Sequence, residues 1–424
     1  MSKKTLFSAV SYAATSGGGG TIGEAGQPGF GCGTYPGPQS DLDAIGLTPM
    51  SGYDDPTSEN YGNYQHSLGS IMVFIPAFAM RFGRSTAPSY SRDGANAVEI
   101  GAPELAGTDG WVLHRAFIDG GQQKLGFFVD KYLCSKKSGN SNIAVSVKNA
   151  NQISLSTSYE NSSSMTGCSG RIYDAITLSR ARGEAYACVS AFQWSALSIL
   201  SLACGQAATS AENCAWYDPN HTINFPKGSN NCRKDYNDSS VTFSQHSKYS
   251  DSGKTGSGTP FAKTTHNGQA CGVADVNGCM WQPLLGVYQT SGGTFAVAKE
   301  SYKMHDFTTG NYNTSSNFDT VSGFYSSSRG CWGNGSNCAF TTETSGAKRA
   351  MCGVFPVSSG ACSSGTALFG NDYARYGDST SFVVLAAGPY GDASNAGVWC
   401  RYGDYNSWSY DGYLVGFRAA GYAQ

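Results

Sequence analysis

The sequence carries little charge and has no strongly basic segment. Of its 424 residues, 14% are Asp, Glu, Lys or Arg, and the formal net charge is −2. No basic run exceeds two residues, as in Lys3-Lys4 and Lys136-Lys137. This composition excludes the electrostatic footprint of a nucleic-acid-binding surface. It does not predict disorder, because 40% of the residues are hydrophobic and 12% are aromatic, enough to form a core.

Long apolar runs are also missing. No stretch reaches the roughly 18 apolar residues of a membrane-spanning helix. The longest candidates, 71–80 and 191–204, are interrupted by Pro76 or by serines, so we expect no membrane insertion. The first 14 residues contain two lysines and an alanine-rich end, but their short apolar core, diluted by Ser and Thr, does not favour a signal peptide.

The residues that form metal or catalytic motifs are sparse and scattered. There is no Cys-x-x-Cys pair for zinc or redox chemistry. We expect most of the 14 cysteines to be buried small hydrophobes, with a disulfide or two if the protein is extracellular. The six histidines do not cluster, and the glycine run 17–20 lacks the Lys-Ser/Thr of a phosphate loop. The sequence therefore predicts no catalytic residue, no cofactor and no metal site.

Glycine, tyrosine, serine and asparagine dominate the composition instead, with 55 Gly and 25 Tyr. This mixture favours loops, and adaptable binding surfaces also use it. Residues 1–70 are rich in Gly and Pro and have few consecutive apolar residues. We expect a loop-rich N-terminal attachment segment over 1–70, with a compact domain as the alternative, and one main domain over 71–424.

Within the main domain the pattern predicts strands on both sides of a helical region. Runs of β-branched and aromatic residues favour strands at 71–80, 124–133, 279–288, 294–298 and 381–387. Long loops are expected at 206–268, and a Ser/Asn/Gly-rich insertion at 309–337. Strands, then helices, then strands again indicate an α+β fold.

Two helices are expected in the middle of the chain. Residues 176–187 can form the first. Ser190 can cap the second, which should end at Gly205. Its apolar residues recur at helical spacing and predict one buried stripe of Phe192, Ala196, Ile199, Leu200 and Ala203.

Five short segments, in order, resemble the formylglycine-generating-enzyme (sulfatase-modifying factor) branch of the C-type lectin fold. They are Met72-Val-Phe-Ile-Pro-Ala-Phe78, Gly126-Phe-Phe-Val-Asp-Lys-Tyr132, the helix pair with Gln193-Trp194, the segment 266–281 and the closing Gly416-Phe417-Arg418. The resemblance covers most of the chain and implies a loop-rich C-type lectin-like fold with large insertions.

Within that family the C-terminal stretch 387–418 looks like the variable region of proteins diversified by retroelements in bacteria and their phages. The Ser-Asn-Ala-Gly-Val segment at 394–398 and the closing Gly-Phe-Arg resemble the fixed frame that brackets their variable positions. Phage tropism determinants, the receptor-binding proteins of tail-fibre tips, are the best-known members. The resemblance implies receptor binding and a location at a phage tail tip or on a bacterial surface.

The sequence departs from the enzymes of this family. They use a Cys-x4-Cys pair before the closing Gly-Phe-Arg, whereas Cys400 is the only cysteine in this segment. A packed or surface role for Cys400 is therefore favoured over catalysis. The family's calcium-binding pattern is also altered in Gly278-Cys-Met-Trp-Gln282. Cys279 replaces an oxygen ligand by sulfur, and Gln282 replaces a carboxylate by an amide. We expect no calcium there.

Polar-tipped aromatic residues are densest between Pro389 and Tyr413. Large, rigid aromatics beside small adaptable residues are the chemistry of antibody-like contact surfaces. The alternative is a glycine-rich aromatic β-region packed against the insertion at 309–337. The predicted ligand-binding residues are Tyr390, Asp392, Trp399, Arg401, Tyr402, Asp404, Tyr405, Trp408, Tyr410, Asp411 and Tyr413.

The genetic code divides these residues into two groups. Random replacement of adenines in Asn codons reaches Tyr, Asp, Gly and Arg, among others, but not Trp. Trp399 and Trp408 are therefore expected to be framework residues or products of another codon. Replacement of Tyr402, Tyr405 and Tyr410 by alanine should abolish binding and leave stability nearly unchanged.

Our leading hypothesis is a non-enzymatic protein that binds a protein or glycan receptor on a cell surface. The N-terminal segment would attach it to a tail or another carrier. Trimerisation would suit a fibre tip because multivalency raises avidity, although no coiled-coil heptads require it. The alternatives are a formylglycine-generating oxidase with a displaced cysteine pair and a secreted bacterial surface adhesin.

Overall fold

The structure is a computed structural model of the 424-residue chain. The residues it describes are 20–158, 160–207, 229–230, 234–235, 253–257, 264–276, 278–290, 294–325, 330–333, 337–357, 359–360, 369–370, 372–377, 382–389, 396–403 and 407–423.

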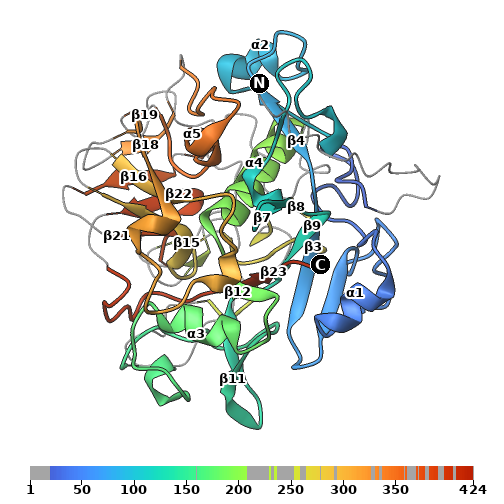
Figure 1. The fold of residues 1–424 in the computed structure, drawn as a ribbon. Coiled ribbons are helices and arrows are strands. Elements are labelled where there is room, and N and C mark those ends of the chain that lie inside the picture. The colour runs from blue at the N-terminus through green and yellow to red at the C-terminus, as the bar shows by residue number, and fades with distance from the viewer. Residues whose placement is uncertain are drawn as a thin grey trace, which may run out of the picture.

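Two β-sheets form most of the fold (Figure 1), and in each the order of the strands differs from their order in the sequence. The six-stranded sheet has the order β1 (Leu47–Pro49), β2 (Asn63–His66), β3 (Ile71–Pro76), β9 (Gly126–Asp130), β23 (Ala419–Gly421), β12 (Tyr186–Cys188). The eight-stranded sheet has the order β17 (Phe318–Ser322), β16 (Thr294–Ala298), β15 (Gln282–Gln289), β21 (Phe382–Ala387), β22 (Gly397–Gly403), β20 (Tyr373–Tyr376), β18 (Gly330–Trp332), β19 (Ser359–Gly360). The β20–β22 pair is parallel.

Smaller sheets, one long α-helix and several short helices complete the described elements. A three-stranded sheet has the order β5 (Val98–Gly101), β4 (Ala79–Phe82), β6 (Val112–Leu113). The two-stranded sheets pair β7 (Ile118–Asp119) with β8 (Gln122–Gln123), β10 (Cys134–Lys137) with β11 (Asn140–Ser146), and β13 (Ser229–Asn230) with β14 (Lys234–Asp235). The helices are α1 (Gln39–Ala44), α2 (Tyr90–Asp93), α3 (Asp174–Arg180), α4 (Ala191–Ala207) and α5 (Gly346–Ala350). This mixture of several sheets and few helices is consistent with the predicted α+β fold and also with a mostly β fold.

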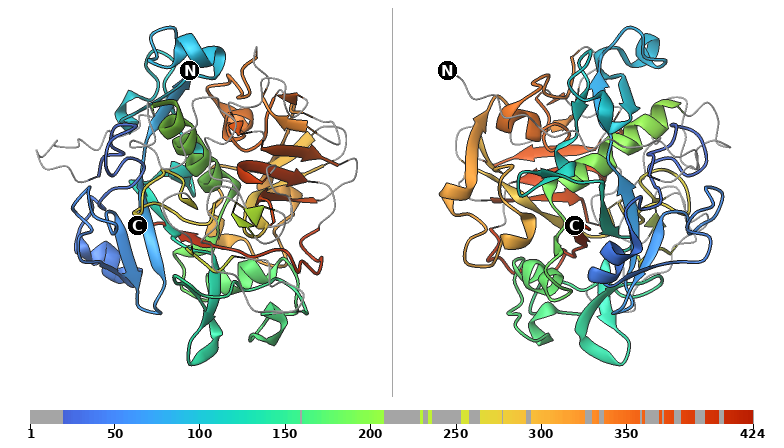
Figure 2. Two further views of the ribbon diagram at one scale, coloured as in Figure 1. Left: turned by 180° about the vertical axis from the view of Figure 1, so that it is seen from behind. Right: turned by 45° about the vertical axis from the view of Figure 1, so that its right-hand side comes forward.

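The long helix α4 lies between the three-stranded and eight-stranded sheets, where it contacts β5, β15 and β22 (Figure 2, left). Its first turn is a capping box. Ser190 Oγ accepts a hydrogen bond from Gln193 N, and Gln193 Oε1 accepts one from Ser190 N. Every residue from Ala191 to Gln206 is buried. The helix is thus buried on all sides, and the prediction of one buried stripe was too narrow.

The C-terminal strand β23 closes the six-stranded sheet by pairing with β9 and β12. Asp130, at the end of β9, accepts a hydrogen bond from Ala419 N through Oδ2 and forms a buried ion pair with Arg182 through Oδ1. The buried Arg418 guanidinium donates to the carbonyl oxygens of Asp130 and Lys131 and to Gln282 Oε1. The closing Gly-Phe-Arg therefore fixes the chain end beside β9, which itself pairs with β3.

Residues 20–70 belong to the same folded body. Strands β1 and β2 extend the sheet outward from β3, and Phe30, Leu42 and Tyr64 are buried. The expected boundary at residue 70 therefore does not separate two units in the described part of this segment. Residues 1–19 lie outside the described residues.

Several predicted elements have different bounds. The first predicted strand is split into β3 and β4. Helix α3 ends at Arg180, and Tyr186–Cys188 is strand β12, because Gly183 adopts a left-handed φ of 130° and the following residues pair with β23. The insertion at 309–337 contains β17 and β18, both in the eight-stranded sheet. In the described residues, no helix has both the length and the apolar character needed to cross a membrane.

Candidate functional site

Within the predicted binding segment 389–413, the described residues 397–403 form a core strand, β22. β22 lies between β21 and β20 in the eight-stranded sheet. Trp399 and Arg401 are completely buried. The Trp399 ring packs against Trp332 of β18, with 4.6 Å between ring centroids. These side chains were expected to contribute to an exposed surface, and their burial corrects that expectation.

Arg401 holds three parts of the core together. Its Nη2 donates to Ser198 Oγ of α4 at 2.9 Å and to Gly353 O at 3.0 Å. Its Nε donates to Val354 O at 3.0 Å, and its Nη1 donates to two carbonyl oxygens of its own strand. Burial lowers the pKa of the Arg401 guanidinium to about 9. The side chain is therefore a structural hydrogen-bond centre.

Trp408 is also buried. It lies near the start of the described segment 407–423, which follows β22 in the sequence. Its ring packs on Tyr312, with 5.6 Å between centroids. Trp332 and Tyr312 both lie in the 309–337 insertion, so for Trp399 and Trp408 the structure agrees with the alternative of aromatics packed against that insertion. Of the two explanations given for the tryptophans, framework residues or products of another codon, their burial fits the first.

Residues 407–415, which we name the C-terminal loop, are held by main-chain hydrogen bonds to two neighbouring segments. Gly412 N donates to Leu155 O at 2.9 Å, and Leu155 N donates to Val415 O at 2.8 Å. Ile172 N and Tyr173 N donate to the carbonyl oxygens of Tyr410 and Trp408 at 3.1 Å and 2.9 Å. The loop backbone is thus fixed on both sides, next to the start of α3.

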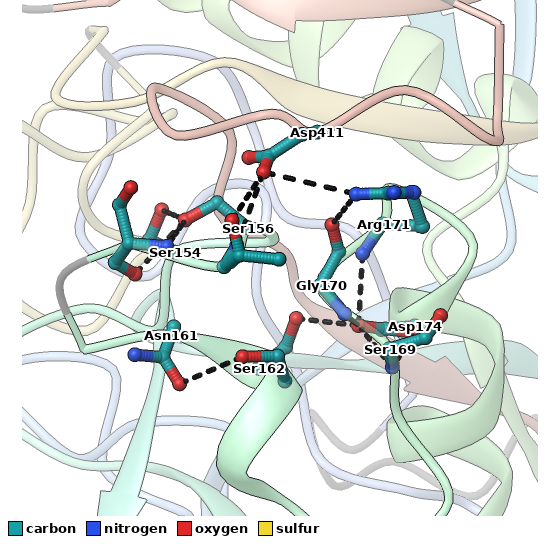
Figure 3. A network of polar contacts seen from close by, with 12 residues as sticks. Ser154, Ser156, Asn161, Ser162, Ser169, Gly170, Arg171, Asp174 and Asp411 are labelled. Atoms are coloured by element: carbon teal, nitrogen blue, oxygen red, sulfur yellow. Dashed lines mark hydrogen bonds and ion pairs between the residues drawn. The ribbon is translucent and has the colours of Figure 1, made fainter.

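Side chains reinforce this anchoring at Asp411 (Figure 3). One oxygen of its half-buried carboxylate accepts hydrogen bonds from Thr157 Oγ1 at 2.6 Å and from Thr157 N at 3.3 Å. The same oxygen lies 3.7 Å from Arg171 Nη1. Asp411 was predicted to contact a ligand, and in this structure its carboxylate is directed at the supporting segments.

The turn that carries Arg171 is itself fixed by a buried carboxylate. Asp174, at the start of α3, accepts hydrogen bonds from three consecutive backbone N–H groups, those of Ser169, Gly170 and Arg171 (Figure 3). Gly170 has a φ of 76°, and a Cβ there would lie 2.7 Å from the backbone of Ser156. Glycine therefore permits the close approach of the two segments that support the C-terminal loop.

Two tyrosines of the C-terminal loop have exposed side chains. Tyr410 is 49% exposed and Tyr413 is 45% exposed. They are two of the four exposed large hydrophobic side chains in the described part of the chain, the others being Tyr90 and Leu105. Their backbone carbonyl oxygens accept hydrogen bonds from Ile172 N and Ser154 Oγ. Rigid backbone and exposed rings are thus combined at one place.

Tyr402 is half-buried at the end of β22. Its ring packs against Trp281, with 5.0 Å between centroids, and the Arg375 guanidinium lies 5.2 Å from its centroid. Arg375 Nη1 also donates to the Tyr402 hydroxyl at 3.2 Å. Tyr402 therefore supports its neighbours, and its truncation will affect packing as well as any contact it makes.

Four predicted binding residues, Tyr390, Asp392, Asp404 and Tyr405, lie outside the described residues. Conversely, the sequence analysis did not identify Thr157 and Arg171, which hold Asp411. The signal available for Thr157 was the Ser/Thr/Asn-rich stretch 154–164, whose side chains favour hydrogen-bonded turns. Its position beside the C-terminal loop is a long-range relationship that no local pattern contains.

The positions that the resemblance would assign to catalysis and calcium binding lie in the core here. Cys400 is a fully buried cysteine in β22. Gln282 Oε1 accepts a hydrogen bond from Arg418 Nε at 2.7 Å. Among the residues that the structure describes, no group of three or more His, Cys, Asp or Glu side chains is placed to hold a metal ion.

No family model and no curated protein matches the sequence. Two solved structures show a distant similarity, the Major Tropism Determinant U1 variant and the Major Tropism Determinant I1 variant, at 12% and 10% sequence identity. The TM-score is 0.28 in both comparisons, which cover 83% of this chain. The chain spans 63% of the length of either structure. No role is carried over from them.

Proposed function

We propose that this chain is a non-enzymatic ligand-binding protein whose contact surface is centred on the C-terminal loop. The observation that supports this most strongly is the exposure of Tyr410 and Tyr413 on a backbone that is hydrogen-bonded on both sides. Tyrosine offers a large contact area for few rotatable bonds. A loop that is already ordered before binding loses little conformational entropy when the ligand arrives.

The finer part of the proposal concerns the setting. The C-terminal stretch 387–418 resembles the variable region of retroelement-diversified proteins with a C-type lectin-like fold of the formylglycine-generating type. On that ground we propose a phage or prophage tail-fibre protein that binds a protein or glycan receptor on a bacterial surface. Attachment through the N-terminal segment and assembly as a homotrimer belong to the same proposal.

Cell binding by matched alanine variants tests the proposal. The fluorescently labelled full chain is incubated with a panel of intact bacterial strains and counted by flow cytometry. We expect Tyr410→Ala with Tyr413→Ala to reduce binding about tenfold or more. Tyr90→Ala removes an exposed tyrosine of α2, far from α3 in Figure 1, and should leave binding unchanged. Equal binding by both variants, or no strain bound by the unmodified chain, would contradict the proposal.

The absence of enzymatic activity is a separate part of the proposal. Burial of Cys400 supports it, because a nucleophilic or copper-binding thiol must reach its substrate. Incubation of the chain with a cysteine-containing sulfatase peptide and copper should leave the peptide mass unchanged. Formation of an aldehyde, detected by mass spectrometry, would instead establish the oxidase alternative.

A further inference from the structure

Two segments far apart in the sequence, 27–33 and 266–272, are held side by side by side-chain to backbone hydrogen bonds. Asn267 Nδ2 donates to Phe30 O at 2.7 Å, and His266 Nε2 lies 3.2 Å from Gly31 O. Gln269 accepts a hydrogen bond from Gly29 N at 2.7 Å and donates one to Gln27 O at 3.0 Å. The contact is therefore specific and continuous over several residues.

Each segment brings one cysteine to this contact. Cys32 and Cys271 are both buried, and both are free thiols in the structure. Their sulfur atoms share a donor, because Asn267 Nδ2 lies 3.6 Å from Cys32 Sγ and 3.7 Å from Cys271 Sγ. The two thiols are also close enough for each to shift the pKa of the other.

The surroundings make the two sulfurs unequal. The neighbouring Cys32 thiol lowers the pKa of Cys271, and the Asn267 amide and the Lys131 ammonium lower it further, although burial opposes them. Burial raises the pKa of Cys32. Lys131 is itself buried and held by Asn63 Oδ1 at 2.6 Å. Cys271 is thus the thiol that ionises first, and the thiolate is the reactive form in disulfide exchange.

We infer that Cys32 and Cys271 form a disulfide when the chain folds under oxidising conditions. The thiolate of one of the two cysteines attacks a low-molecular-weight disulfide such as oxidised glutathione, forming a mixed disulfide and releasing one small thiolate. The other cysteine then loses its proton and displaces the second small thiolate. Two protein thiols are oxidised, one small disulfide is reduced to two thiols, and the released protons pass to solvent or to the thiolates.

The bond would tie the N-terminal segment covalently to the body of the protein. Because both sulfurs are buried, the exchange takes place during folding, before segment 27–33 is fully packed. This inference is independent of the proposed function, since it needs only the contact between the two segments.

Peptide mapping of the full chain tests the inference. The chain is refolded with reduced and oxidised glutathione, denatured, alkylated without reduction, digested and analysed by mass spectrometry. Cys331, which is disulfide-bonded in the structure, reports that oxidation has occurred. We expect one cross-linked peptide pair containing Cys32 and Cys271, lost in Cys32→Ala and in Cys271→Ala.

Cys204→Ala is the matched control. Cys204 is buried and its thiol donates to the carbonyl oxygen of the same Asn267 at 3.1 Å, so this variant should keep the cross-link. Closing so long a loop should also raise Tm by about 5 °C in the unmodified chain and in this control relative to Cys32→Ala. Alkylated Cys32 and Cys271 beside an oxidised Cys331, or a bond from either cysteine to Cys204, would overturn the inference.

Discussion

The carboxylate of Asp411 accepts a hydrogen bond of 2.6 Å from the hydroxyl of Thr157, a residue more than half the chain away in sequence. This contact joins the C-terminal loop to the segment that precedes α3. Together with the main-chain hydrogen bonds of Gly412 and Leu155, it holds the loop in one conformation while Tyr410 and Tyr413 stay exposed.

Removal of this contact should loosen the C-terminal loop and leave the fold intact. We expect Asp411→Ala to reduce the free energy of unfolding by about 1 kcal/mol, because the contact is charge-assisted but partly exposed. Hydrogen exchange at the Gly412 amide should become faster. In a double-mutant cycle, Thr157→Val should add little to Asp411→Ala. Fully additive effects would show that the two side chains do not interact.

Arg401 should be far less tolerant of substitution than Tyr410. Its guanidinium donates to acceptors in α4, in β22 and at residues 353–354, all in the core. Arg401→Met should lower the free energy of unfolding by about 3 kcal/mol or more, because several buried carbonyl oxygens lose their donor. Tyr410→Ala should change it by less than about 0.5 kcal/mol. Urea denaturation of both variants measures the difference, and similar costs would contradict the assigned positions.

The buried pair of Asp130 and Arg182 should be essential for closing the fold. Their oxygen and nitrogen atoms lie 2.5 Å apart, and both side chains are almost completely buried. Arg182→Met should cost about 3–5 kcal/mol, because it leaves the Asp130 charge buried without its cation. The exposed pair of Lys348 and Glu343 is the control, and Glu343→Gln should cost less than about 0.5 kcal/mol.

Three buried histidines predict that the protein loses stability in mild acid. His66, His114 and His266 each accept a backbone N–H at Nδ1, from Leu68, Ala116 and Val273. Burial lowers their pKa values to about 4, 3 and 4. A folded-state pKa below the unfolded value of about 6.5 gives stability that is complete above that pH and is lost as the pH falls toward the folded pKa.

As the pH falls from about 6.5 to 4, each of these histidines should therefore lower the free energy of unfolding by about 1.4 kcal/mol per pH unit. Burial raises the pKa of Asp275 to about 6, and this carboxyl group acts in the opposite direction over part of the same window. Burial also raises the pKa of Asp119, which acts in the same direction as Asp275. The three histidines outweigh these two carboxyl groups, so Tm measured from neutral pH downward should fall. A Tm that is constant or rises across this window would contradict the prediction.

The local signals in the sequence predicted the elements better than their arrangement. Ser190 caps α4 as predicted, and β16 has the predicted bounds, because capping and β-branched runs are local effects. The burial of α4 on all sides depends on the two sheets around it. The strands inside the 309–337 insertion also depend on distant partners, since pairing with β16 and β20 outweighs their Ser/Asn/Gly-rich composition.

The structure divides the described members of the predicted binding site into buried and exposed side chains. Composition located the aromatic segment but could not distinguish Trp399 and Arg401, inside β22, from Tyr410 and Tyr413, which are exposed. Burial depends on which surfaces meet across the fold. The codon argument separated the two tryptophans from the tyrosines. Arg is among the residues that adenine replacement in Asn codons can reach, yet Arg401 is a core residue.

Blocking the C-terminal loop with a bulky group tests its role as the contact surface most directly. Ser409 is exposed beside Tyr410, and Ser91 is exposed on α2. Ser409→Cys and Ser91→Cys, each labelled with a polyethylene glycol maleimide, are compared for binding to the same bacterial cells. The account predicts that labelling abolishes binding only at position 409. Equal binding by the two labelled proteins would contradict it.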